Sequence, residues 1–287
     1  MDTTKVRGNF RSLLPALAAA IVWAGTLAAA AAPAIPKYWD NRERIPQPDL
    51  QSVERIRFLT TIDFPPFNFV DNDGRLAGFN VDVARAICAE LGISERCQIE
   101  AVPWDELQGI LTGGGAEAII AGMAPSASAR ETLGFSRPYF RMPARFAVPR
   151  AKHAQENITD NITGKRIGVV SDTAHAAVLG NYFPGAEAIA FPDQAAMLAA
   201  LKEGKLDAAF GDGVSLSFWL GSNVSDKCCA FSGGPYMAPQ FLGDGMTVAV
   251  RKEDRILVNA FNNALQAMEE KGVMAELYLK YFPNSFY

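Results

Sequence analysis

Two phenylalanines flank a pair of prolines in the stretch "TTIDFPPFNF", residues 60–69. Phe64 and Phe67 follow an apolar run that is typical of a buried strand, and Pro65-Pro66 blocks continuation of that strand because proline has no backbone N–H. The rings therefore lie on a loop at a strand end. They either fill the core or cover a flat or zwitterionic molecule, and the loop position favours a binding site.

The sequence shows no constellation of residues that is typical of a catalytic site. It contains no G-x-S-x-G, no H-E-x-x-H and no phosphate-cradling Gly-Lys motif. The glycines at 113–115 end a helical pattern and are followed by no Lys-Ser/Thr pair. His153 and His175 are the only histidines, and for His175 we expect solvation on a helix surface. We predict no catalytic residue, no metal site and no cofactor.

The four cysteines form two pairs. Cys88 and Cys97 lie at the end of one predicted helix and the start of the next strand, a spacing that indicates a local disulfide in an exported protein. Closing so short a loop adds about 2 kcal/mol of stability in the loop-entropy model. Cys228 and Cys229 are adjacent, so a vicinal disulfide, two buried thiols and an intermolecular bridge all remain open.

Residues 1–34 have the order of a secretory signal. Lys5, Arg7 and Arg11 precede an uncharged run rich in Leu and Ala, and small residues with A-x-A options near Ala30 and Ala34 close it. The run is also long enough for a retained membrane anchor, but the small-residue zone favours cleavage. We expect a mature N-terminus within residues 31–35 and a periplasmic protein.

The mature chain is an ordinary globular protein with an acidic balance. The 287 residues are 49% hydrophobic and 20% charged, which fits one large domain or two of ordinary size. Without the signal segment, 24 Lys and Arg stand against 30 Asp and Glu, a net charge of −6. No basic stripe interleaved with aromatic residues is present, so we expect no nucleic-acid partner.

From Arg55 onward the chain alternates strand and helix patterns, which predicts an α/β fold with largely parallel sheets. Residues 35–54, with three prolines and mixed charge, look like an extended leader outside the main fold. The segment "FNVDVARAICAELG" predicts a helix that ends at Gly92. The predicted strands are Ile56–Thr61, Ile99–Val102, Ala118–Ala121, Phe146–Val148, Arg166–Val170, Ala186–Phe191, Ala208–Gly211 and Met246–Val250.

One unit of this alternation occurs twice. The segments "LQGILTGGGAEAIIAG" (107–122) and "MLAALKEGKLDAAFGD" (197–212) each read as an apolar helix, a glycine stop, an acid and a short apolar strand. Two copies suggest two similar lobes. Because ligands of open α/β sheets bind beyond the carboxyl ends of the strands, the residues after both strands become site candidates: Gly122, Met123, Ser126 and Asp212.

Six motifs in order resemble the extracytoplasmic solute-binding proteins of polar amino acid ABC transporters, bacterial extracellular solute-binding protein family 3. They run from about Arg55 to Phe282: "IDFPPFNFVDNDGRLAGFNVDVARAI", "WDELQGILTGGGAEAIIAGM", "FSRPYF", "GKRIGVVSDTAH", "LKEGKLDAAFGD" and "FLGDGMTVAVRKED". The resemblance implies a monomeric carrier that captures a small polar solute, most simply an amino acid, and delivers it to an ABC permease in the inner membrane.

The resemblance also implies the type II periplasmic-binding-protein fold. Each of its two lobes is a mixed, mostly parallel sheet flanked by helices, and two hinge strands join the lobes. We expect crossings near Val148–Ala151 and Gly245–Val248. Lobe 1 then comprises residues 55–148 and 246–287, and lobe 2 comprises residues 149–245. The pair Cys88–Cys97 also resembles a disulfide of some members.

Site roles are implied by the same resemblance. Phe64, next to Asp63, covers the ligand, and Phe67 lines or supports the same wall. Arg130 clamps the ligand carboxylate as a two-pronged fork. Thr173, at a helix start, supplies a hydroxyl and backbone N–H groups to that carboxylate, and Asp212 binds the α-ammonium.

Three departures from the family pattern bear on the ligand. Ala124 stands where a Ser or Thr is usual, and the usual "GTT" turn reads Asp172-Thr173-Ala174. Arg130 lies five residues before Phe135-Ser136 instead of six, and one residue rotates a helix position by about 100°. Fewer hydroxyls then face the solute, which leaves room for a non-standard amino acid.

Two other classes compete with the carrier. The same fold hosts periplasmic enzymes, such as lyases that resemble cyclohexadienyl (prephenate or arogenate) dehydratase, which need a general acid in the cleft; Asp172 is the one unassigned acid of the turn motifs. A sensory or structural module is the other class. Turnover of a prephenate-like compound would indicate the enzyme, and a solute returned unchanged would indicate the carrier.

Overall fold

The computed structural model describes residues 1–2, 37–40, 42–46, 49–50, 53–153, 157–282 and 285–287. The predicted signal peptide and its cleavage zone lie outside the described residues, apart from Met1 and Asp2. No helix in these ranges is both long and apolar enough to cross a bilayer.

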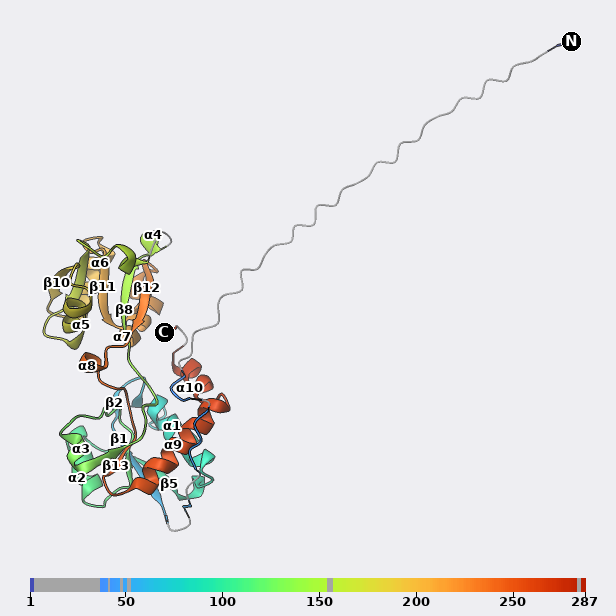
Figure 1. Cartoon of the computed structure of the whole chain (residues 1–287), viewed down its shortest axis with the longest axis vertical. Coiled ribbons are helices and arrows are strands. Elements are labelled where there is room, and N and C mark those ends of the chain that lie inside the picture. Colours follow the sequence, from blue (N-terminus) through green and yellow to red (C-terminus); the bar gives the residue numbers. More distant parts are fainter. Residues whose placement is uncertain (3–36, 41, 47–48, 51–52, 154–156, 283–284) are drawn as a thin grey trace. The chain divides into compact units, whose positions relative to one another are not determined.

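The first sheet has the strand order β5-β1-β6-β13-β7. Figure 1 labels β1, β5 and β13 of this sheet. β1 is parallel to β5 and β6, whereas β13 is antiparallel to β6 and β7. We call this sheet and the helices that cover it lobe 1. Its strands are β1 (Ile56–Thr60), β5 (Cys97–Ala101), β6 (Ala118–Ile119), β7 (Leu133–Phe135) and β13 (Ala249–Arg251).

Helices cover both faces of the lobe 1 sheet. Side chains of α1, α9 and α10 pack in one apolar cluster with one face of the sheet, and α2 packs in another cluster with the opposite face. The predicted stop of α1 is confirmed: the helix ends at Glu90, and Gly92 takes a left-handed φ of 69° just beyond it. The helices are α1 (Phe79–Glu90), η1 (Ser94–Arg96), α2 (Trp104–Thr112), α3 (Ala129–Thr132), α9 (Arg255–Glu270) and α10 (Val273–Tyr281).

The second sheet, which with its helices forms lobe 2, has the order β10-β9-β11-β8-β12. β10, β9 and β11 are parallel, and β8 is antiparallel to both β11 and β12. Its strands are β8 (Ala144–Pro149), β9 (Arg166–Val170), β10 (Glu187–Phe191), β11 (Ala208–Asp212) and β12 (Cys229–Tyr236).

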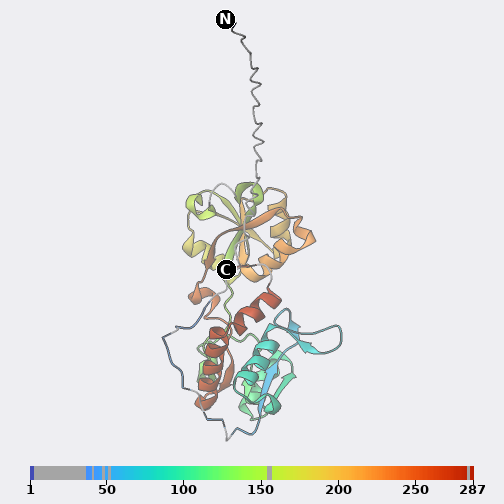
Figure 2. The same ribbon diagram turned by 90° about the vertical axis from the view of Figure 1, so that its right-hand side faces the viewer.

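Helices also lie on both faces of the lobe 2 sheet (Figure 2). α5 packs with one face, and α6 and α7 pack with the other. The helices are α4 (Arg150–His153), η2 (Ile158–Asn161), α5 (Ala174–Tyr182), α6 (Gln194–Lys202), α7 (Gly213–Gly221), η3 (Asn223–Ser225) and α8 (Pro239–Leu242). The predicted two-lobe α/β architecture, with mixed sheets flanked by helices, is therefore confirmed, and each sheet has two parallel and two antiparallel strand pairings.

The repeated unit occupies the same place in each lobe. It runs from α2 into β6 in lobe 1 and from α6 into β11 in lobe 2. In lobe 1 a Glu117 carboxylate oxygen accepts the backbone N–H of Arg57 at 2.7 Å, and in lobe 2 Asp207 accepts that of Arg166 at 3.0 Å. The acid of each copy thus accepts a backbone N–H at the start of the neighbouring parallel strand. Its position in the sequence alone did not predict this contact.

The first crossing between the lobes lies earlier than predicted. We expected it near Val148–Ala151, but β8 pairs along its length with lobe 2 strands β11 and β12. The crossing therefore falls at residues 141–143. The return crossing follows α8, and at Phe140 and Met246 the two segments form a β-bridge. The apolar run of β8 reads as a strand equally well in either lobe, so only its pairing decides its place.

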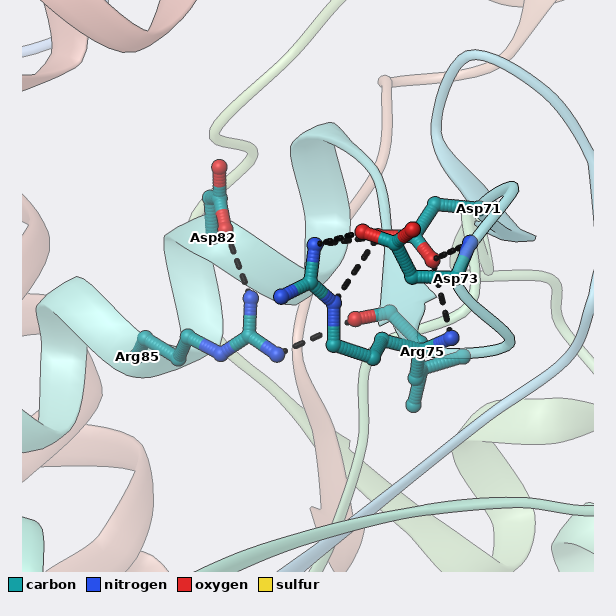
Figure 3. A network of polar contacts seen from close by, with 6 residues as sticks. Asp71, Asp73, Arg75, Asp82 and Arg85 are labelled. Carbon is teal, nitrogen blue, oxygen red and sulfur yellow. Dashed lines mark hydrogen bonds and ion pairs between the residues drawn. The ribbon is translucent and has the colours of Figure 1, made fainter.

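A small antiparallel sheet follows β1, with the order β2-β3-β4: β2 (Asp63–Phe64), β3 (Asn68–Val70) and β4 (Leu76–Ala77). The polar "DNDG" segment is its turn. Asp71 accepts the backbone N–H groups of Asp73 and Arg75 at 2.9 Å each, and the Arg75 guanidinium contacts both acids (Figure 3). The charges of this turn are therefore paired with one another.

The described residues of the leader pack against lobe 1, contrary to the expectation that residues 35–54 lie outside the main fold. Trp39 and Leu50 are each only 8% exposed and belong to the larger lobe 1 cluster. The Arg137 guanidinium lies 5.0 Å from the Trp39 ring centroid and pairs with Glu43. Proline and mixed charge do not reveal such an apolar anchor in the sequence.

Both cysteine pairs are bonded. The predicted Cys88–Cys97 disulfide is confirmed, and it ties the end of α1 to the start of β5. Cys228 and Cys229, for which three states were open, form a vicinal disulfide just before and at the start of β12.

Candidate functional site

The carboxyl ends of the parallel strands of lobe 1 bring several predicted residues to one edge. Asp63 and Phe64 follow β1, Gly122 to Ser126 follow β6, and β1 lies between β5 and β6. Loops that follow parallel neighbours leave the sheet at the same edge. The structure therefore gathers these lobe 1 candidates as the sequence predicted.

Phe64 and Phe67 have different environments. Phe67 is 1% exposed and makes edge contacts with Phe79 and Phe140, so it is a core residue. Phe64 is half-buried and stacks on Phe67, with centroids 4.7 Å apart and planes at 25°. We call this stacked pair the aromatic wall: Phe67 is its buried inner ring, and Phe64 is its more exposed outer ring.

Gly122 lies directly beside this wall. Its φ is 85°, and a Cβ at this position would come within 2.9 Å of a Phe64 ring carbon. Any side chain here would therefore displace the ring. The neighbouring Met123 carbonyl accepts both the backbone N–H and the hydroxyl of Thr247, each at 3.0 Å. This loop is held by the return strand of the hinge.

The polar candidates of lobe 1 are exposed at the same edge. Asp63 pairs with Phe69 across the small sheet and points into solvent. The Ser126 hydroxyl accepts the backbone N–H of Ala129, the first residue of the short helix α3, at 3.1 Å. Neither the Asp63 nor the Ser126 side chain is packed in a core.

Arg130 is directed toward the hinge. Its guanidinium lies 3.8 Å from an Asp244 carboxylate oxygen and 5.6 Å from the Phe135 ring centroid, with 56% of the side chain exposed. An exposed ion pair of this kind contributes little stability, so Asp244 does not fix the side chain. This contact with Asp244 occurs at the position where Arg130 departs by one residue from the family pattern. The role of Arg130 as a clamp for the ligand carboxylate stays a prediction.

In lobe 2, Thr173 and Asp212 both begin helices at the carboxyl ends of parallel strands. Thr173 follows β9 and caps α5, accepting the N–H of Ala176 at 3.2 Å and donating to the Val170 carbonyl at 2.8 Å. Asp212 ends β11 and caps α7, and its Oδ1 accepts the N–H of Ser215 at 2.7 Å. Two helix N-termini therefore face the same edge, which favours a negatively charged group.

His175 is less exposed than we expected for a residue solvated on a helix surface. It lies in the first turn of α5, two residues after Thr173, and it is half-buried. Burial lowers the pKa of its imidazole, and the nearby Asp212 carboxylate opposes that shift.

Trp104 is a second aromatic residue at this edge, and it is 53% exposed. It begins α2 just after β5, the strand next to β1, so it lies at the same edge as Phe64. An exposed tryptophan at such an edge offers a second aromatic face. Its position directly after a predicted strand end could have indicated this.

No group of three or more His, Cys, Asp or Glu residues that could hold a metal ion occurs among the described residues. Asp172, the acid considered for the enzyme alternative, is exposed and has a left-handed φ of 56° between β9 and α5. The groups described at these strand ends are aromatic faces in lobe 1, and helix starts with an acid in lobe 2.

The sequence pattern of a known family, described as "Bacterial extracellular solute-binding proteins, family 3", matches residues 56–284. The L-arginine-binding protein of Pseudomonas aeruginosa is 28% identical over 242 residues, which are 84% of this chain and 92% of that protein. The lysine/arginine/ornithine-binding periplasmic protein of Escherichia coli is 27% identical over 236 residues, 82% of this chain and 90% of that protein.

Among solved structures, the chain is similar to the L-cystine solute receptor of Neisseria gonorrhoeae in its unliganded open conformation. The TM-score is 0.69 at 20% sequence identity, and the match covers 81% of this chain and 94% of the receptor. At this identity the likeness concerns the fold alone.

Proposed function

Since this chain belongs to family 3 of the bacterial extracellular solute-binding proteins, we propose that it is a periplasmic carrier. It captures an amino acid or a close relative and delivers it unchanged to an ABC permease. The observation that carries the proposal is the chemical contrast between the two lobes at the carboxyl ends of their parallel strands. Lobe 1 presents aromatic faces, and lobe 2 presents two helix starts together with a carboxylate.

Each end of a zwitterion has a matching group. Asp212 receives the α-ammonium, and the start of α5 at Thr173, with Arg130 from lobe 1, receives the α-carboxylate. The ring of Phe64 and the indole of Trp104 cover the aliphatic part of the solute. Relatives named for arginine, lysine and ornithine support placing the basic amino acids first among the candidates.

The first experiment is a thermal-shift screen of the wild-type protein against amino acids and amines, followed by calorimetry. We expect at least one zwitterionic solute to raise the melting temperature by binding the folded state. Recovery of the same compound unchanged after incubation distinguishes a carrier from an enzyme. Conversion of a prephenate-like compound would instead identify the dehydratase-like enzyme.

Asp212→Asn then tests the ammonium contact. Asn caps a helix as well as Asp, so the contact with Ser215 is retained and only the charge is lost. We expect affinity to fall by about 2–5 kcal/mol, since a buried ammonium would be left unpaired. The matched control is Asp193→Asn. Asp193 caps α6, the helix that follows the edge strand β10 of lobe 2. Equal affinity of Asp212→Asn and wild type would rule out the ammonium assignment.

A further inference from the structure

The C-terminal end of the chain packs into the core of lobe 1. Phe286 is 0% exposed, and its ring centroid lies 5.5 Å from that of Tyr278 on α10 and 6.0 Å from that of Phe140. Phe282, just after α10, is 1% exposed and belongs to the same apolar cluster. We therefore treat Phe282 and residues 285–287 as part of lobe 1 and call them the C-terminal segment.

Arg145 on β8 connects lobe 2 to this segment. Its guanidinium donates to the Phe286 carbonyl at 2.9 Å and lies 4.5 Å from the ring centroid of Phe231 on β12. Arg145 is only 8% exposed, and its Nε has no acceptor among the described residues. Because burying a cation costs free energy unless its donors find acceptors, the Phe286 carbonyl is an important partner for this side chain.

Apolar side chains of α7 contact lobe 1 at the same place. The Phe218 ring meets the Phe282 ring edge-on, with centroids 6.2 Å apart, and Phe218 is 43% exposed. Val214, one turn earlier on α7, is 5% exposed and belongs to the larger apolar cluster of lobe 1. We call the Arg145 bond, the Phe218 contact and the Val214 packing the C-terminal junction.

The C-terminal junction lies on the opposite side of both sheets from two of the contacts proposed for the solute. It involves α7 in lobe 2 and the α10 face of lobe 1. Thr173 begins α5, which covers the other face of the lobe 2 sheet. Arg130 lies on α3, which packs in one cluster with α2 on the other face of the lobe 1 sheet. The two crossings lead into β8 and β13 of these sheets and therefore lie between the two sides.

Closure about these crossings would separate the junction. A rotation that brings the lobes together on one side of a hinge moves them apart on the other side. The Arg130 side chain is 56% exposed and Trp104 is 53% exposed, so the solute side is open to solvent while the junction is in contact. Closing the solute side would therefore break the Arg145 bond and the Phe218 contact.

We propose that the C-terminal junction is a latch that stabilises the open form of the protein and so weakens solute binding. This inference rests on the proposed two-lobe carrier function. Phe286 lies beyond residues 56–284, which match the family, so one partner of the latch is an addition to the family pattern. The apparent affinity of a carrier depends on the fraction of molecules that can close, as well as on the solute contacts. Loss of the latch should strengthen binding, whereas general damage to the fold would weaken it.

The test uses two variants, each of which removes one contact of the junction. Phe218→Ala removes a partly exposed ring, and Arg145→Met keeps an unbranched apolar side chain beside Phe231 without the donor. The probe is the amino acid that raises the melting temperature most in the thermal-shift screen. We expect each variant to lower the Kd for this amino acid by about three- to tenfold.

The matched control is Arg96→Met. The Arg96 guanidinium also donates to a backbone carbonyl, that of Val53 at 2.5 Å, but both residues belong to lobe 1 and its leader. We expect the Kd of this variant to stay within about twofold of wild type. If Arg145→Met does not fold, Phe218→Ala decides the test alone.

Single-molecule energy transfer without solute gives a second readout. One dye is attached through Glu106→Cys on α2 and the other through Asn181→Cys on α5, both exposed positions. We expect the closed fraction to be at least about threefold larger in Phe218→Ala than in the parent protein, and unchanged in Arg96→Met.

A Kd of Phe218→Ala that is unchanged or higher than that of wild type, or an unchanged closed fraction, would overturn the latch. A wild-type protein that binds nothing in the screen would contradict the proposed function instead. The closed fraction without solute would then still decide whether the C-terminal junction holds the lobes apart.

Discussion

At the scale of single residues, two phenylalanines of one short loop have different roles in the proposed site. Phe67 is enclosed by Phe79, Phe140 and Phe282, whereas Phe64 stacks on it and is only half-buried. An aromatic pair of this kind makes a rigid, flat surface at low entropic cost, because the inner ring fixes the outer one. In the proposed site, the stack would connect core packing directly to solute recognition.

This division predicts opposite outcomes for two alanine substitutions. Phe67→Ala removes a fully buried ring and should lower the free energy of unfolding by about 3–5 kcal/mol. Phe64→Ala should leave the protein folded with a smaller loss of stability, and it should weaken solute binding by up to about tenfold. Urea unfolding and calorimetry measure the two effects. If Phe64→Ala unfolds the protein, that ring belongs to the core and its covering role is wrong.

At the scale of elements, the site depends on where helices begin. α5 and α7 each start at a strand end with a capping side chain, so their N-termini are fixed at the carboxyl edge of lobe 2. In lobe 1, a disulfide and an ion pair tie α1 to β5 and to α10. The Cys88–Cys97 bridge joins α1 to β5 across nine positions, and Asp82 on α1 binds Lys280 on α10 at 2.6 Å.

The disulfide should therefore stabilise lobe 1 without changing recognition. We expect the double variant Cys88→Ala/Cys97→Ala to lose about 2–3 kcal/mol of unfolding free energy, because the open chain regains loop entropy. The control is Cys228→Ala/Cys229→Ala, whose bridge joins adjacent residues and closes almost no loop. Denaturant unfolding measures the loss of unfolding free energy, and solute titration measures the Kd. Equal losses of unfolding free energy in the two variants, or a large change in Kd, would contradict this account.

At the scale of the whole molecule, the leader residue Tyr38 and the C-terminal Tyr287 meet at the first crossing. Tyr38 of the leader and Tyr287 share a hydroxyl contact of 2.7 Å, and both bind the backbone of Arg141. Arg145, at the start of lobe 2, donates to the Phe286 carbonyl at 2.9 Å. The crossings are therefore linked to the terminal segments as well as to the two sheets.

The distribution of the proposed contacts over both lobes predicts that binding and closure are coupled. Phe64 and Arg130 belong to lobe 1, while Thr173 and Asp212 belong to lobe 2. A solute that touches both lobes stabilises the closed form by its differential affinity. We expect small-angle scattering to show a smaller radius of gyration at saturating solute, with an unchanged circular dichroism spectrum. An unaltered scattering curve would rule out the two-lobe carrier mechanism.

The sequence by itself determined the features that depend on local pattern. Alternating strand and helix signals, the repeated helix-glycine-acid-strand unit and the Cys88–Cys97 spacing predicted the fold class, the two lobes and one disulfide correctly. They also placed Asp63, Phe64, Gly122 and Asp212 at strand ends, because periodicity and chain-breaking residues report where an element stops.

Only the tertiary structure decided what each of these residues faces. It assigned β8 to lobe 2, packed the leader onto lobe 1, turned Arg130 toward Asp244 and left Trp104 exposed. It also joined Asn68, Asn80 and Tyr139 by buried hydrogen bonds. The physical reason is the same in each case. A local pattern shows which face of an element is apolar, whereas strand partners, ion pairs and buried hydrogen bonds come from segments far away in the sequence.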